Sequence, residues 1–160
     1  MAPDGGWAWG DIEVTPRTTI VELILDGNVA AELDTARRSL ASVIRSEDTL
    51  DNRAITEARA EVARIEQAAV DASRPFTVRS IGYRRWRELC AAHPPAHDGE
   101  RWNIDTFIPA VLLECCDQFH TSDHVDQAVD VLSSGQIAKL FNACRELNEG
   151  ADTVPTVRGR

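Results

Sequence analysis

The chain has 160 residues, of which 43% are hydrophobic and 27% charged, and its formal net charge is −9. This composition is typical of a soluble globular protein, and the acidic charge argues against general affinity for nucleic acid. No apolar run approaches the roughly 20 residues of a membrane span, and the N-terminus lacks the features of a signal peptide. We therefore expect a cytoplasmic protein with no membrane or nucleic-acid partner.

Residues 1–16 are rich in glycine, proline and aspartate, which predicts a flexible N-terminal arm. Trp7 and Trp9 lie within this arm. Two tryptophans in such a segment suggest contact with a partner, so both are candidate partner-binding residues. The alternative, that they fold back onto the chain's own core, stays open.

Residues 17–81 are predicted to form a strand, a helical hairpin and a second strand. The first strand is the β-branched, apolar run 18–25, which the turn residues 26–28 stop, with Asn28 as the expected cap of the next helix. Pro75 is expected to end the second helix, and the run PFTVRSIG then reads as a strand. Because a helical hairpin returns the chain to its starting point, the two strands can pair antiparallel.

The hairpin is predicted from two apolar seams whose members recur at alternating steps of three and four residues. Residues 46–52 separate the seams, which is typical of two antiparallel helices joined by a short turn. The second seam is rich in alanine, which lets the backbones approach closely but buries little area. The first seam comprises Val29, Leu33, Ala36, Leu40 and Val43, and the second Ile55, Ala58, Val62, Ile65, Ala69 and Ala72.

Residues 82–150 are predicted to form a helical bundle. The helix over 83–92 places Trp86 on an apolar stripe, while its arginines lie off that stripe. This spacing favours a core tryptophan with solvated arginines over a nucleic-acid platform, which needs both on one surface. Prolines 94 and 95 end this helix, and residues 151–160 form a polar tail that we expect to be disordered.

Three further helices complete the predicted bundle. Asp105 or Thr106 is the expected cap of the first, which would place Pro109 in its first turn. Ser122 is expected to cap the second, and Ser133 or Ser134 the third. The expected fold class is thus mainly α, with a small two-stranded antiparallel β element, a helical hairpin inserted between the strands and a helical bundle after them.

No residue pattern predicts catalysis or cofactor binding. The chain has no phosphate loop, nucleophile elbow or dinucleotide fingerprint. Its histidine pairs at i,i+4 are interrupted by prolines or by a helix cap, and its cysteines lack zinc-site spacing. We expect a non-enzymatic protein without metal or cofactor, whose four cysteines are reduced and act as small apolar side chains.

Four ordered features carry a resemblance to a known family over residues 18–148. They are the strand-to-helix run 76–95 ending in His-Pro-Pro, NIDTFIPA at 103–110, LSSGQ at 132–136, and Leu147-Asn148. Together with the charged helical hairpin, this order resembles tail assembly chaperones of long-tailed siphophages, especially those of high-G+C hosts. The chain would correspond to the short, non-frameshifted form.

The resemblance implies a non-enzymatic function in the host bacterial cytoplasm. Such chaperones bind the long helical tape measure protein, keep it soluble while the tail tube assembles, and are absent from the mature virion. Further implied partners are the frameshifted long form and tail tube subunits. The alanine-rich hairpin itself suggests a second copy of the chain as another partner.

Trp102 and Phe107, where a loop meets a helix, are candidate client contacts, with core anchoring as the alternative for Phe107. The helical hairpin is a second candidate for the client surface. The alternative function is a structural virion component of the tail or head–tail connection, or a helical adaptor.

Overall fold

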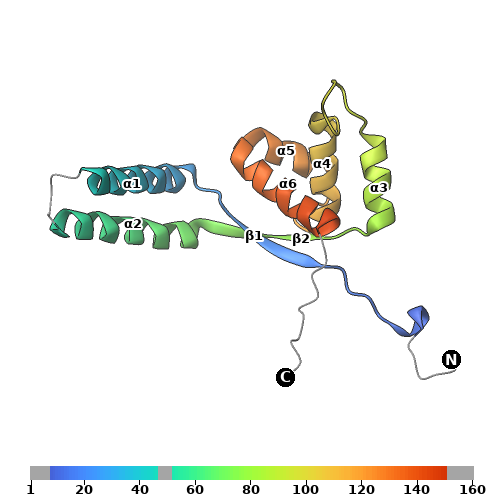
Figure 1. Ribbon diagram of the computed structural model, residues 1–160, viewed down its shortest axis with the longest axis horizontal. Helices are drawn as coiled ribbons and strands as arrows, with labels where there is room; N and C mark the ends of the chain where they lie inside the picture. The colour runs from blue at the N-terminus through green and yellow to red at the C-terminus, as the bar shows by residue number, and fades with distance from the viewer. Residues whose placement is uncertain (1–7, 47–51, 151–160) are drawn as a thin grey trace. The chain divides into compact units, whose positions relative to one another are not determined.

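The structure, a computed structural model, describes residues 8–46 and 52–150 (Figure 1). It is mainly helical, 66% in six helices, and has a two-stranded antiparallel sheet, as predicted. The chain divides into two compact units. One is the continuous segment Val21–Phe76, and the other combines the residues up to Ile20 with those from Thr77 onward.

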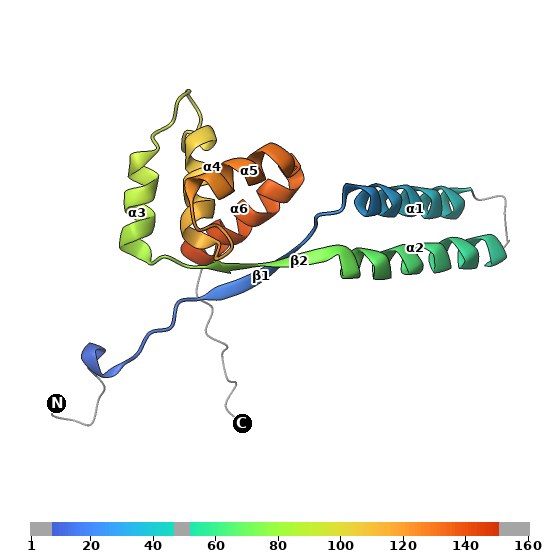
Figure 2. The same cartoon turned by 180° about the vertical axis from the view of Figure 1, so that it is seen from behind.

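The predicted strand, hairpin and second strand are confirmed as β1 (Thr18–Ile24), α1 (Gly27–Arg45), α2 (Asn52–Ala72) and β2 (Ser73–Arg79). In both views α1 and α2 lie side by side and antiparallel (Figures 1 and 2). Leu33, Ile65 and Ala69 form the buried centre of their contact, and Val29 and Ala36 pack against it. These are seam residues, so the three-and-four spacing correctly identified the buried face of each helix.

The cap of α1 differs from the prediction. Asp26, not Asn28, is the N-cap, because its carboxylate accepts hydrogen bonds from the backbone N–H groups of Asn28 (2.9 Å) and Val29 (3.4 Å). The helix therefore begins one residue before Asn28, and Asn28 lies inside its first turn. A cap must keep an extended backbone, and Asp26 does so at φ −82° and ψ 107°.

The prediction that Pro75 ends α2 is wrong. The helix already stops at Ala72, and Pro75 lies within β2. The backbone N–H of Thr77 donates to the side-chain oxygen of Gln118, and its carbonyl accepts the backbone N–H of Asp117. These backbone groups therefore point to the outer edge of β2, away from β1. Backbone groups alternate in direction along a strand, so Pro75 lies on that same outer edge. A proline is tolerated there because no ladder hydrogen bond is lost.

The second unit contains the predicted helical bundle. It comprises α3 (Tyr83–Ala92), α4 (Ile104–Cys115), α5 (Ser122–Val131) and α6 (Ser134–Glu149). Helix α4 packs against α3, α5 and α6. Its apolar residues are accordingly among the most deeply buried of the chain, namely Phe107, Val111, Leu112 and Cys115.

Two of the three predicted helix caps in the bundle are wrong. The N-cap of α4 is Asn103, whose carbonyl already accepts the backbone N–H of Phe107 (2.9 Å), so Pro109 lies beyond the first turn. The N-cap of α5 is Thr121 rather than Ser122, since the Thr121 hydroxyl accepts the N–H of His124. Ser133 is confirmed as the cap of α6 and forms a reciprocal capping box with Gln136.

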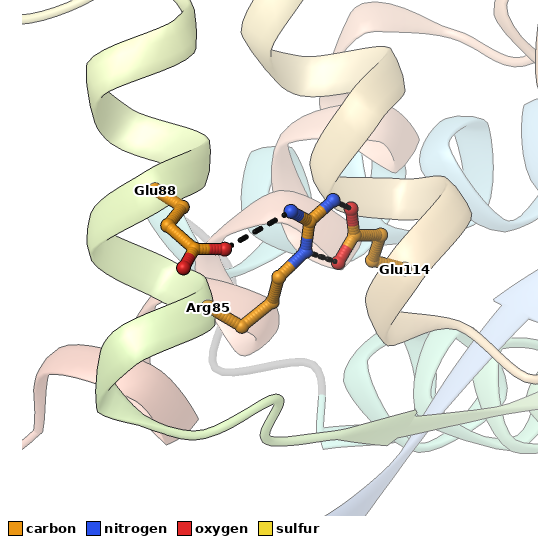
Figure 3. Close-up of polar contacts among 3 residues, drawn as sticks. All are labelled: Arg85, Glu88 and Glu114. Carbon is orange, nitrogen blue, oxygen red and sulfur yellow. Dashed lines mark hydrogen bonds and ion pairs between the residues drawn. The ribbon is translucent and has the colours of Figure 1, made fainter.

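The stretch from β2 into α3 is joined to the bundle by polar contacts. Asn148 accepts the backbone N–H of Ile81 (3.0 Å), and Glu149 accepts the indole N–H of Trp86 (3.2 Å). Figure 3 shows the Arg85 side chain between two carboxylates, that of Glu88 on the same helix, α3, and that of Glu114 on α4. Its hydrogen bonds to Glu114, and next to Glu88, raise the pKa of the Arg85 guanidinium.

Within the described residues, no helix has the length and apolar character needed to cross a membrane.

Candidate partner-binding surface

The predicted site residues fall in three different environments. Trp7 lies outside the described residues. Trp9 belongs to a short 3₁₀ turn, η1 (Trp9–Asp11), and is 73% exposed, so it does not fold back onto a core. Its role in partner binding stays a prediction.

Trp102 and Phe107 lie in the centre of the bundle. Phe107 is 0% exposed, and its ring stacks on that of Trp102 with centroids 4.5 Å apart and an interplanar angle of 26°. Trp86 and Phe141 contact Phe107 edge-on at 5.7 and 5.9 Å. Core anchoring, the alternative for Phe107, is therefore confirmed. Partner binding through either Trp102, which is 7% exposed, or Phe107 would require this core to open.

Three cysteines meet inside the same unit. The sulfur of Cys144 lies 4.0 Å from that of Cys116, and the Asn148 amide donates to the sulfur of Cys115 (3.7 Å). Hydrogen bonds with Cys115 and Cys116, together with burial, raise the pKa of the Cys144 thiol. The prediction of buried thiols is confirmed for these three, whereas Cys90 is half-buried.

No group of three or more histidine, cysteine, aspartate or glutamate side chains is placed to hold a metal ion in the part of the chain that the structure describes. The structure therefore offers neither the cysteines nor the histidines as a metal centre there. The remaining candidate surface is the helical hairpin.

The two sides of the hairpin differ in chemistry. On one, which we call the charged side, the groove between α1 and α2 is lined mainly by polar residues. These include Glu32, Thr35, Ser39, Glu61 and Arg64. Arg64 donates to Glu61 through Nε (2.9 Å) and Nη2 (2.8 Å), which lowers the pKa of Glu61. This side is well suited to contact with water.

The opposite side, which we call the apolar side, carries an open groove of about 480 Å³. Its apolar lining residues are Ile24, Leu33, Ala69 and Val70. Helical spacing extends this side along α1, because residues 30, 33, 37, 41 and 44 follow one another at steps of three and four. All of these are alanine, leucine or isoleucine except Arg37.

Two large apolar side chains are exposed at opposite ends of the apolar side. Val70, at the strand end of the hairpin, is 66% exposed, and Ile44, near the other end of α1, is 52% exposed. Between them Arg37 donates from Nη2 to Glu66 Oε1 at 2.9 Å, which joins the two helices. The apolar side thus exposes two aliphatic side chains with an ion pair between them, and its groove is also lined by Glu22 and Ser73, which are hydrogen-bonded to each other.

The hairpin carries part of the acidic charge of the chain. Residues 21–76 hold eleven acidic and seven basic side chains, which amounts to −4 of the net charge of −9. Three of the acidic residues, Glu47, Asp48 and Asp51, fall between α1 and α2 in the sequence, outside the described residues.

Comparison of the chain with protein families, with curated proteins and with solved structures finds no match. The apolar side is a feature that sequence reasoning missed. The sequence does contain a signal for it, because two seam residues of α1 are each followed by another apolar residue. Ala41 follows Leu40, and Ile44 follows Val43, so the apolar stripe is wider than the seam alone.

Proposed function

We propose that the chain is a phage tail assembly chaperone of the class that its motif order resembles, and that its client is the tape measure protein. The client would bind through a helix laid on the apolar side of the hairpin. The observation that carries this proposal is the exposure of Ile44 and Val70 on a two-helix layer of a strongly acidic chain. An apolar surface inside a charged, soluble shell is what a protein needs to keep a hydrophobic client in solution.

An amphipathic client helix suits this surface. Such a helix binds through side chains at i, i+3, i+4 and i+7, and a groove between two antiparallel helices accepts a row of this kind. Full burial of an aliphatic side chain contributes about 1.5–3 kcal/mol, so covering two half-exposed ones contributes about 2 kcal/mol in total. Binding of a single hairpin is therefore weak and reversible, which a chaperone that leaves before the virion is complete requires.

The proposal has no catalytic step and assigns no cofactor. Its site of action is the host cytoplasm, and the expected further partners are a frameshifted long form and tail tube subunits. The alternative, a structural component of the tail or of the head–tail connection, or a helical adaptor, would use the same surface differently. Mass spectrometry of purified particles separates the two, because a chaperone is missing from them and a structural protein is present.

The direct test is co-expression with helical fragments of the tape measure protein. Wild-type chain should raise the soluble fraction of the client, and Val70→Glu or Ile44→Glu should abolish that effect, since each places a charge on the apolar side. Ser39→Glu is the matched control, because it adds the same charge to an exposed position on the charged side of α1. Equal client solubility with and without the chain would refute the proposal.

A further inference from the structure

The three buried cysteines of the helical bundle have no part in the proposed function. We propose that they form an oxidation site, in which a peroxide converts the thiols of Cys116 and Cys144 into a disulfide. Cys115 lies beside this pair and stays a thiol. This inference goes beyond the proposed function, because it concerns the bundle rather than the hairpin and involves no client.

The first argument is the distance between the two sulfur atoms. The Sγ atoms of Cys116 and Cys144 lie 4.0 Å apart, and the two residues are 2% and 0% exposed. A disulfide needs a sulfur–sulfur distance of about 2.05 Å, so each sulfur has to move by about 1 Å. A movement of this size lies within the reach of a side-chain rotation.

The second argument is that the backbone holds both cysteines in place. Cys116 is the C-cap of α4, where its N–H donates to the carbonyl of Leu112 (3.0 Å), and it forms an antiparallel bridge with Val78 of β2. The carbonyl of Cys144, within α6, accepts the side-chain amide of Asn148 (2.8 Å). Because the two sulfurs are held as neighbours, each thiol is at a high effective concentration for the other once one of them is oxidised.

The third argument explains why Cys115 is left as the free thiol. Hydrogen bonds from Cys144 and from Asn148, the latter at 3.7 Å, lower the pKa of the Cys115 thiol. In thiol–disulfide exchange, a sulfur of lower thiol pKa leaves more readily. Exchange within the cluster therefore expels Cys115 from a bond to Cys144 and leaves Cys116 as the partner.

Hydrogen peroxide is the oxidant that balances the reaction. A thiolate sulfur attacks one peroxide oxygen, the O–O bond breaks, and a sulfenic acid and one water form. The neighbouring thiol sulfur attacks the sulfenic sulfur, the S–S bond forms, and the sulfenic oxygen leaves as a second water. Each sulfur loses one electron, the peroxide gains two, and both thiol protons end in the two waters. Since hydrogen peroxide is little larger than water, brief local openings of the bundle admit it more readily than larger thiol reagents.

The test uses the full chain with the substitution Cys90→Ser, which removes the half-buried cysteine and any cross-link through it. Treatment of the native protein with hydrogen peroxide should lower its mass by about 2 Da, the loss of two hydrogen atoms, and dithiothreitol should restore the mass. Fragmentation of the unreduced peptides between residues 115 and 116 should place the bond at Cys116 and Cys144. An unchanged mass, a gain of oxygen only, or a bond to Cys115 would overturn the inference.

Two alanine variants in the same background separate the roles of the thiols. Cys144→Ala should abolish the loss of about 2 Da, whereas Cys115→Ala, which also removes a buried thiol of the cluster, should retain it. Circular dichroism verifies that both variants keep their helices. The opposite result for either variant would contradict the assignment.

The melting temperature shows whether the folded packing accepts the bond. The oxidised protein should melt at least about 5 °C above its reduced form, because the disulfide closes the loop between the end of α4 and α6. An oxidised form that melts below the reduced one would overturn the inference. No client is present in these measurements, so their failure would leave the proposed function standing.

Discussion

Replacing Phe107 by alanine tests the assignment of this residue to the bundle core rather than to a partner surface. The side chain is 0% exposed and contacts the rings of Trp86, Trp102 and Phe141. Truncation of a buried phenylalanine costs about 3–5 kcal/mol, and each aromatic pair contributes about 0.5–1.5 kcal/mol beyond its buried area. We expect a loss near the upper end, about 4–5 kcal/mol, which is a large fraction of the roughly 5–15 kcal/mol typical of a folded domain.

The assay is urea unfolding followed by tryptophan fluorescence, because Trp86 and Trp102 both lie beside Phe107 and report on the bundle. Ile104→Ala is the matched control, since Ile104 starts the same helix but is 50% exposed and should cost only about 0.5 kcal/mol. A Phe107→Ala variant within about 1 kcal/mol of wild type, at an unchanged urea dependence, would refute the assignment. Such a result would make Phe107 a candidate client contact again.

Two further predictions concern the hairpin cap and the thiols. Asp26→Ala should destabilise α1 by about 1 kcal/mol, because two backbone N–H groups lose their acceptor. Asn28→Ala should cost only about a few tenths of a kcal/mol, because Asn28 is not the cap. Hydrogen exchange in the first turn of α1 measures both effects. In native protein at about pH 8, a thiol reagent should modify Cys90 first and the other three cysteines only on unfolding, because they are buried and the raised pKa of Cys144 keeps its thiol protonated. Rapid modification of all four would contradict this packing.

The elements that sequence reasoning identified best are those with strong periodicity. The seam around Leu33 and Ile65 and the stripe with Trp86 each repeat over several turns, so one ambiguous residue does not change the result. Helix caps were identified less well. Around Asp26, and again around Thr121, neighbouring residues can all accept a backbone N–H, and the choice depends on which residue keeps an extended backbone.

The candidate site was harder to predict for a different reason. An aromatic residue beside a loop, such as Trp102, has the same local sequence whether it faces a partner or the core, and the decision depends on helices distant in sequence. Phe141 of α6, for example, contacts both Trp102 and Phe107. The apolar side of the hairpin depends in turn on which flank of each seam comes together, since Ile44 and Val70 belong to one surface only when α1 and α2 pack as they do.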